Sequence, residues 1–318
     1  MNHRLLELHL HLDGSLRPAT VLELACQQGV DLGVQELDQV DFQMRVPANC
    51  TSLVEYLERF EMPLRVLQRE DAIERVTFEL VEDLARAGLS YVEIRFAPQL
   101  SVKQGLTQDQ VVEAAIRGAR RGMEAYPSIR VGLILCCMRG GDNEALNLDT
   151  VETARKYLGD VVCAVDIAGA ENLFATECFR PVFEKVRAYG LPMTIHAGEA
   201  AGPDSMRTAL SFGTKRIGHG IRAVDDPQLI RELVRQEVTL EICVTSNVHT
   251  RLVDSAALHP VRQLFDAGVK VTVNSDNMTV SNTDLRKEMA LLQEQLGFTD
   301  QEIDTMLGYA WDARFLKD

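Results

Sequence analysis

Short apolar runs alternate with helical patterns along most of the chain, and this alternation is the feature that most constrains the fold. A first strand-like run lies near the N-terminus, and seven more follow it at residues 89–96, 129–138, 161–167, 192–196, 216–218, 238–244 and 269–274. Helical patterns lie between them, near residues 107–125, 147–158, 177–190, 203–212, 226–236 and 257–267. Runs rich in Val, Ile and Leu that alternate with helices are typical of a parallel sheet. Eight such units predict an α/β fold closed into a (β/α)8 TIM barrel.

The main alternative is a doubly wound open sheet. In its dinucleotide-binding form a G-x-G-x-x-G turn follows the first strand, whereas here Asp13-Gly14-Ser15 follows it. A chain of 318 residues could hold two domains, but α/β barrels of this size are routinely one. We therefore predict a single domain over residues 1–318. A helical insertion at about residues 18–88, after the first strand, would cover one end of it.

Charge and cysteine content narrow the function class. The chain carries 33 basic and 47 acidic residues, a net charge of −14. An acidic chain without basic clusters is a poor partner for nucleic acid or an anionic membrane, and no apolar run approaches the ~18 residues of a membrane span. The seven cysteines show no C-x-x-C spacing. We expect a cytoplasmic protein with reduced cysteines that acts on small molecules; the sequence leaves the oligomeric state open.

The first strand combines leucines with ionisable residues. In a regular strand, Leu6, Leu8, Leu10 and Leu12 would share one face, and Glu7, His9, His11 and Asp13 would share the other. Two imidazoles on one face suit a single metal ion. A surface strand that shows its histidines to water is the alternative. The apolar run and the Asp-Gly turn that closes it favour a site at the end of a buried strand.

Polar residues also stand where four other predicted strands end. They are Asp166 and Gly169, then His196 and Glu199, then His219 between two glycines, then Asn274-Ser275-Asp276-Asn277. Active-site side chains of such barrels lie at these strand ends. His9, His11, His196 and Asp276 could bind one Zn²⁺ through three nitrogens and one oxygen, with a position left for water. Taken singly, a histidine is more often a packed core residue, and an Asp after a strand is usually a turn residue or cap.

Two more residues of this set have catalytic interpretations. Glu199 lies three residues beyond His196 and could shuttle protons beside the metal; the alternative is a first-turn helix residue favoured by the dipole. His219 could orient the attacking water or stabilise developing charge; the alternative is a neutral packed histidine. His3, His249 and His259 are predicted to be structural or exposed.

Taken together and in order, these motifs resemble the adenosine deaminase family within the amidohydrolase barrels. The resemblance spans nearly the whole chain. The motifs are His9-Leu10-His11-Leu12-Asp13-Gly14-Ser15, Asp166-Ile167-Ala168-Gly169, His196-Ala197-Gly198-Glu199, Gly218-His219-Gly220 and Ser275-Asp276.

The resemblance implies zinc-dependent hydrolytic deamination of adenosine, and of 2′-deoxyadenosine, to inosine and ammonia in purine salvage. One Zn²⁺ per chain would be held by His9, His11, His196 and Asp276, and a water that it activates would attack C6 of the purine. Glu199 would protonate purine N1 and pass a proton to the leaving ammonia, with His219 and Asp276 positioning the water. The substrate contacts implied are His11, Asp13, Ser15, Gly169 and Asn277. Among these, Asp13 would hold a ribose hydroxyl and the Gly169 N–H would face purine N3.

Two positions depart from the family pattern. Val244 stands where bacterial relatives usually have Pro, a change for which the residues suggest no functional consequence. Asn277 stands where the family usually has a second Asp, which is expected to donate a hydrogen bond to purine N7. A carboxylate donates only when protonated, whereas an Asn amide always carries donors. Two other functions stay open: deamination of another aminopurine (adenine, an N6-substituted adenine nucleotide or a modified adenosine), and nucleoside binding by an inactive relative.

Overall fold

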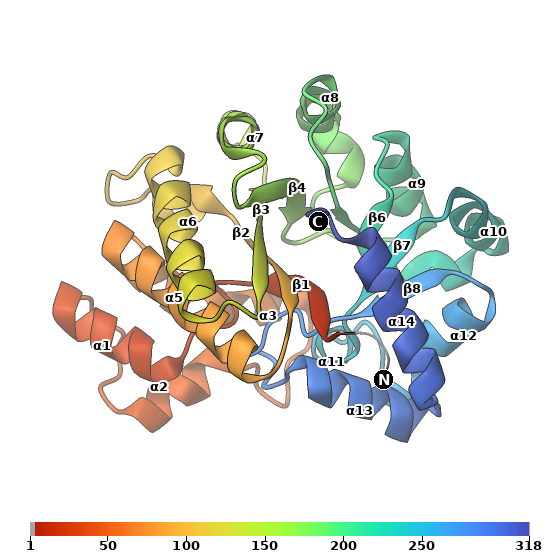
Figure 1. The fold of residues 1–318 in the computed structure, drawn as a ribbon, viewed down its shortest axis with the longest axis horizontal. Coiled ribbons are helices and arrows are strands. Elements are labelled where there is room, and N and C mark those ends of the chain that lie inside the picture. Colours follow the sequence, from red (N-terminus) through yellow and green to blue (C-terminus); the bar gives the residue numbers. More distant parts are fainter. Residues whose placement is uncertain (1–3, 318) are drawn as a thin grey trace.

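Eight strands lie side by side in chain order around a central axis (Figure 1). The structure is a computed structural model that describes residues 4–317. The strands are β1 (Leu6–His11), β2 (Tyr91–Phe96), β3 (Arg130–Met138), β4 (Val162–Ala168), β5 (Ile195–Ala197), β6 (Arg216–His219), β7 (Thr239–Ile242) and β8 (Lys270–Val273). Neighbouring strands pair in parallel. The predicted (β/α)8 barrel is therefore confirmed.

Two narrow seams close the barrel. Continuous pairing joins β1 to β4 and β5 to β8 as two four-stranded sheets. Between β4 and β5, the Val165 N–H donates to the Pro192 carbonyl at 3.0 Å. Between β8 and β1, the His11 N–H donates to the Asp276 carbonyl at 2.7 Å, and the Asp276 N–H donates to the His9 carbonyl at 3.0 Å. The second seam thus brings the first and last strands together at three of the predicted metal ligands.

Helices form an outer ring around the strands (Figure 1). They are α5 (Glu70–Arg86), α6 (Gln108–Ala125), α7 (Glu144–Tyr157), α8 (Arg180–Ala188), α9 (Pro203–Ser211), α10 (Pro227–Gln236), α12 (Val261–Asp266), α13 (Leu285–Leu296) and α14 (Asp300–Ala313). Their inner faces are apolar at helical spacing, as Val111, Ala115 and Ala119 show on α6, and these side chains are fully buried. The main apolar core therefore lies between the strands and this ring.

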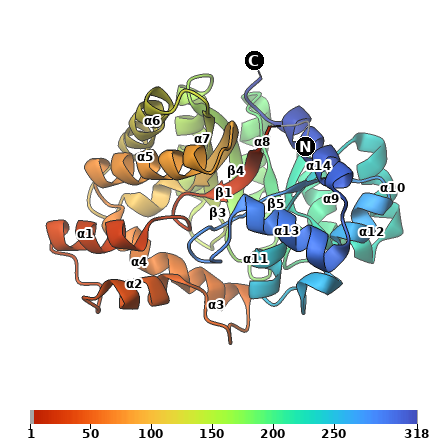
Figure 2. The ribbon, with the colours of Figure 1, turned by 60° about the horizontal axis from the view of Figure 1, so that its bottom comes forward.

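Four short helices precede α5 within the predicted insertion. They are α1 (Pro18–Gln28), α2 (Leu37–Met44), α3 (Leu53–Leu57) and α4 (Glu61–Val66), with a 3₁₀ turn, η1 (Glu58–Phe60), after α3. Figure 2 shows them gathered on one side of the barrel. Ser52 caps α3, because its hydroxyl accepts the Glu55 backbone N–H at 3.3 Å.

The alternation predicted for β1 is interrupted at its centre. The pairing of β1 with β2 shifts register between Glu7 and Leu10, which is the behaviour of a β-bulge. The Glu7 carboxylate accepts the backbone N–H and the hydroxyl of Ser275, and burial raises its pKa to about 7. His9 and His11 point instead to the Asp276 side chain. Glu7 is therefore not part of the histidine cluster, although β1 is buried as predicted.

Other differences from the sequence predictions lie in the second half of the chain. The predicted strand at 238–244 is too long, since β7 ends at Ile242 and a helix, α11 (Val244–His249), begins two residues later. The helices α11, α13 and α14 fall outside the helical segments that were predicted by residue range.

The cysteines are all free thiols, as expected, and five of the seven are buried. None of the helices within residues 4–317 is long and apolar enough to cross a membrane. His3, predicted to be structural or exposed, lies outside the described residues.

Candidate metal centre and active-site pocket

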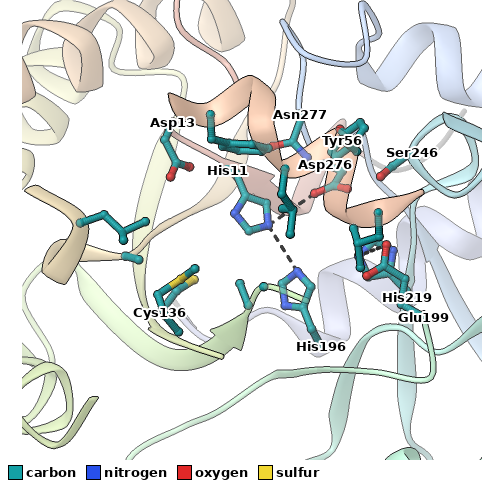
Figure 3. Close-up of a pocket in the computed structure, with 18 of the residues that line it drawn as sticks. His11, Asp13, Tyr56, Cys136, His196, Glu199, His219, Ser246, Asp276 and Asn277 are labelled. Carbon is teal, nitrogen blue, oxygen red and sulfur yellow. Dashed lines mark hydrogen bonds and ion pairs between the residues drawn. The ribbon is translucent and has the colours of Figure 1, made fainter. Parts of the chain in front are cut away.

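Three imidazole nitrogens and one carboxylate oxygen converge at the C-terminal ends of the strands. His11 Nε2 lies 3.3 Å from His196 Nε2 and 3.4 Å from Asp276 Oδ1. His9 Nε2 lies 3.3 Å from the same Asp276 oxygen. Figure 3 shows His11, His196 and Asp276 turned toward one another inside the pocket. The structure therefore brings together all four predicted metal ligands.

The spacing of these atoms fits their binding to one shared metal ion. Nitrogen and oxygen ligands lie about 2.0–2.1 Å from such an ion, so two ligands of one ion are less than ~4.2 Å apart. The three separations of 3.3, 3.3 and 3.4 Å meet this condition. His9 Nε2 is also buried and forms no hydrogen bond within the described chain. A buried, unpaired nitrogen is costly unless a ligand takes its lone pair. The donor set thus forms a candidate metal site.

Two buried carboxylates orient two of these imidazoles. Glu241 Oε2 lies 2.9 Å from His9 Nδ1, and Asp166 Oδ2 lies 2.8 Å from His196 Nδ1. A carboxylate beside Nδ1 keeps the ring proton there and leaves the Nε2 lone pair for a metal. Arg95 joins the two carboxylates, because its guanidinium donates to Asp166 at 2.6 Å and to Glu241 at 2.8 Å.

The same network continues through the barrel interior to Arg216. The Arg216 guanidinium donates to Glu241 Oε1 at 2.7 Å and to Glu93 Oε2 at 2.6 Å. Thr194 donates its hydroxyl to Glu241 Oε1 at 2.8 Å. Burial disfavours a charged carboxylate, but Arg95 and Arg216 outweigh it and hold the pKa of Glu241 well below its usual value. Glu241 is therefore an ionised acceptor behind His9.

Cys243 also lies close to His9, His219 and Asp276. Burial raises the pKa of its thiol well above the usual value, and Sγ lies 3.6 Å from the Glu241 carbonyl oxygen, to which it donates. The thiol is thus engaged by the backbone of β7, and Cys243 is not one of the four proposed ligands.

Glu199 lies in the loop after β5 and faces the pocket (Figure 3). Burial raises its pKa well above the usual value, and the negative charges of Asp276 and Glu171 act in the same direction. Its Oε1 atom lies 3.7 Å from His219 Nε2. A carboxyl group that stays protonated near neutral pH can act as a general acid.

Glu171 holds this loop in place and was missed in the sequence. Four successive backbone N–H groups, those of residues 198–201, donate to its carboxylate at 2.8–3.0 Å. The Ser205 hydroxyl donates to it as well. Glu171 lies just beyond the Asp166-x-x-Gly169 motif, so an acidic residue after a predicted strand end was the only signal. Its partners are backbone amides, which residue types do not reveal.

His219 has an unusual backbone for a histidine, with φ at +62° in the left-handed region. Its Nδ1 atom lies 3.2 Å from Asn247 Nδ2, and Asn247 Oδ1 lies 3.2 Å from His259 Nε2. Burial lowers the pKa of His219 well below its usual value. His259 is buried behind the site, in agreement with its predicted structural role, whereas Asn247 was missed.

A cavity of about 220 Å³ opens beside the cluster. The helical insertion supplies an apolar wall through Leu53, Tyr56, Leu57, Phe60 and Leu64. The lining also includes Leu100, Cys136, Met138, Ala168 and Gly169. The pocket is therefore a mostly apolar slot with its polar groups near the metal ligands, a form suited to a flat heterocycle.

Two of the predicted substrate contacts, Asp13 and Asn277, line this slot and have polar atoms without a hydrogen-bond partner in the described chain. Asp13 Oδ1 and Asn277 Oδ1 are buried and have no hydrogen-bond partner in residues 4–317. Burial raises the pKa of Asp13 to about 7. Gly169 has φ at +108°, a conformation that glycine adopts readily, and its backbone borders the cavity. Such atoms are available to a ligand.

Ser15 is placed differently from its prediction as a substrate contact. It does not border the cavity, and its hydroxyl accepts the Met278 backbone N–H at 3.1 Å. Ser15 therefore ties the loop after β1 to the loop after β8, because the turn at Asp13-Gly14 points its side chain away from the slot.

Comparison with known proteins finds relatives that match almost the whole chain. The family model described as Adenosine deaminase matches residues 5–318. The adenosine deaminase of Haemophilus ducreyi is 42% identical over 316 residues, which cover 98% of this chain and 92% of that protein. Among solved structures, the adenine deaminase of Arthrobacter aurescens superposes with a TM-score of 0.91 at 25% identity, covering 99% and 95% of the two chains. The N6-methyl-AMP deaminase of Arabidopsis thaliana gives 0.85 at 29% identity, covering 99% and 93%.

Replacing Glu241 tests whether the buried network tunes the metal site. Glu241→Gln should lower the affinity for added Zn²⁺ about 10–100-fold, because the amide no longer holds His9 as a carboxylate does. It should also lower the melting temperature, since Arg95 and Arg216 lose an anionic partner. Competition against a chelator measures the first effect and thermal unfolding the second.

Glu237→Gln is the matched control, since Glu237 pairs with Lys270 on the surface with 74% of its side chain exposed. Wild-type Zn²⁺ affinity in Glu241→Gln would show that Glu241 does not tune His9.

Proposed function

The chain belongs to the adenosine deaminase family, and we propose that it converts adenosine and 2′-deoxyadenosine to inosine and ammonia by zinc-dependent hydrolysis in purine salvage. The observation that carries the proposal is the convergence of His9, His11, His196 and Asp276 beside a buried Glu199, at the end of a purine-sized slot. The free cysteines favour a reducing, cytoplasmic location.

The metal proposed for the site is one Zn²⁺ per chain. Three imidazoles and one carboxylate are typical zinc ligands, and the ligand spacing suits the ion. Bound zinc would lower the pKa of a coordinated water to about 7 and so supply a nucleophile at neutral pH.

Glu199 is the proposed proton carrier. In its protonated form it would donate to purine N1 as water adds to C6, which lets the ring accept the electron pair without a full negative charge. The resulting carboxylate would take a proton from the added oxygen and deliver it to the departing amine. The raised pKa of Glu199 supports this role, because the acid must be protonated when the substrate binds.

The remaining polar groups are proposed to hold the substrate and the water. His219 would position the water, with Asp276 beside it. The Gly169 N–H would face purine N3, and the Asn277 amide would face N7. Asp13, whose Oδ1 has no partner in the described chain, would accept a hydrogen bond from a ribose hydroxyl.

The lining of the pocket favours a nucleoside over the substrates of the two structural neighbours. Among the described residues that line it there is no lysine or arginine, so a phosphate would lack a cationic partner. With free adenine, Asp13 would keep its unpaired oxygen, and a site built to bond a missing hydroxyl discriminates by up to ~10⁴–10⁵-fold.

The direct test is the ultraviolet change when the protein is mixed with adenosine, before and after chelation and with Zn²⁺ added back. We expect conversion to the inosine spectrum that chelation abolishes and zinc restores. The specificity constant kcat/KM for adenosine should exceed that for adenine and AMP by at least about 100-fold. A tenfold preference for adenine or AMP would refute the nucleoside assignment, and nucleoside binding without turnover in the zinc-loaded protein would support an inactive relative.

Glu199→Gln isolates proton transfer. The variant should keep its zinc but lose about 10²–10⁴-fold in kcat, because an amide cannot donate and recover a proton in the same way. Steady-state kinetics together with metal analysis measure both quantities, with the exposed Glu184→Gln as control. An active Glu199→Gln enzyme would remove Glu199 from the mechanism.

Asn277→Asp tests the contact with purine N7. The variant should stay active but become pH dependent, with kcat/KM falling as pH rises through the pKa of the new carboxyl, since only its protonated form donates. The pH profile of kcat/KM is the measurement, and Asn282→Asp at an exposed site is the control. An unchanged profile would mean that Asn277 does not contact the base.

A further inference from the structure

We propose that Asn247 and His259 fix the tautomer of His219, so that His219 presents an N–H donor at Nε2 toward the reacting water. Both are positioning residues, because they reach the reacting atoms only through His219. The relay is the series of hydrogen bonds from the Val261 backbone N–H through His259 and Asn247 to His219. The direction of each bond follows from the Val261 N–H, which can only donate.

The relay begins at the backbone N–H of Val261, the first residue of α12. This N–H donates to His259 Nδ1 at 3.1 Å. A backbone N–H can only donate, so His259 Nδ1 must be an acceptor without a proton. The single ring proton of a neutral His259 then resides on Nε2, and burial, which lowers its pKa to about 3, keeps the ring neutral.

The orientation of the Asn247 amide follows from this proton. His259 Nε2 lies 3.2 Å from Asn247 Oδ1, so the nitrogen donates and the amide oxygen accepts. The other arm of the amide, Nδ2, is thereby directed at His219. Oxygen and nitrogen of an Asn are normally distinguished only by their partners, and here the partner leaves one choice.

His219 receives the last link of the relay. Asn247 Nδ2 lies 3.2 Å from His219 Nδ1 and carries only donor hydrogens, so Nδ1 must be an unprotonated acceptor. An imidazolium would set two donors against each other at this distance. The ring proton of His219 therefore lies on Nε2, the atom 3.7 Å from Glu199 Oε1.

Burial and backbone geometry make this arrangement rigid. Asn247 is fully buried and His259 is 3% exposed, so water does not compete for the links. His219 is held at a positive φ of 62°, a conformation that costs a non-glycine residue energy and persists only where the surroundings enforce it. The relay thus gives His219 a single role as a fixed donor, while Glu199 carries the exchangeable proton.

Nitrogen NMR of the full-length, zinc-loaded protein with ¹⁵N-labelled histidine tests the tautomer directly. The ¹⁵N shifts of an imidazole distinguish Nδ1–H, Nε2–H and imidazolium forms, and comparison with His219→Gln identifies the signals of His219. The wild type should show the Nε2–H form across neutral pH. An Nδ1–H or imidazolium signal would overturn the proposal.

Asn247→Asp reverses the last link. A carboxylate only accepts, so it should draw a proton to His219 Nδ1 and convert the spectrum to the Nδ1–H or imidazolium form. Because the donor at the reacting water is then lost or altered, kcat should fall about 10²–10³-fold, with KM changed much less. An unchanged His219 spectrum in a folded variant would refute the relay.

His259→Phe removes the first link without adding a charge, which covers the case in which Asn247→Asp does not fold. It frees the Asn247 amide to turn over, so the His219 signals should show a mixture of tautomers and kcat should fall about tenfold or more. The matched control is His249→Phe at the end of α11, where Nδ1 has no hydrogen-bond partner in residues 4–317. A pure Nε2–H spectrum in His259→Phe would refute a role for His259.

Only the kcat values rest on the proposed function. If the wild type shows the Nε2–H form but deaminates no adenosine, the relay stands and the proposed function fails. If both variants change the tautomer but keep wild-type kcat, the proposed importance of the relay for catalysis fails while the function stands.

Discussion

The candidate active site depends on the ion pairs that fill the barrel beneath it. Glu241 accepts hydrogen bonds from Arg95, Arg216 and Thr194 and still bonds His9. A buried charge is tolerated only when it is paired and hydrogen-bonded, and in this network each carboxylate is paired with Arg95 or Arg216. The network keeps two carboxylates ionised directly behind two imidazoles. A cation bound by these imidazoles is stabilised by the two negative charges, which also hold the ring protons away from the metal-facing nitrogens.

Two different parts of the structure form the pocket: the strand ends with their loops carry the reactive groups, and the helical insertion supplies an apolar wall. The metal ligands and Glu199 stand on strand ends or on loops fastened by buried acceptors such as Glu171. The apolar wall comes from α3, η1 and α4, which lie outside the ring of barrel helices (Figure 2). Chemistry and shape selection can therefore vary separately: a change in the insertion alters what fits, while the charged interior continues to set the reactive groups.

The sequence predicted the parts of this site that are carried by residue type and strand position. The eight strands, the four converging ligands and the carboxyl of Glu199 follow from the period of the apolar runs and from polar residues at strand ends. The network behind them could not be predicted, since Arg95 and Glu241 stand within short apolar runs whose inward faces are unknown before the barrel closes. The register shift in β1 and the turn of Ser15 away from the slot are set by local pairing between distant segments. Asn247 and Glu171 act through hydrogen bonds to partners in other segments of the chain, which their residue types do not reveal.

The seam between β1 and β8 has a consequence for biosynthesis. His9 and His11 are translated before Asp276, which lies more than 260 residues later in the chain and meets them across the seam. A nascent chain therefore lacks one ligand until Asp276 has been made, and the full ligand set exists only once β8 has docked on β1. A metal ion would then bind after the barrel has closed, and it would stabilise the short seam between β8 and β1. An occupied site would therefore indicate a completely folded chain.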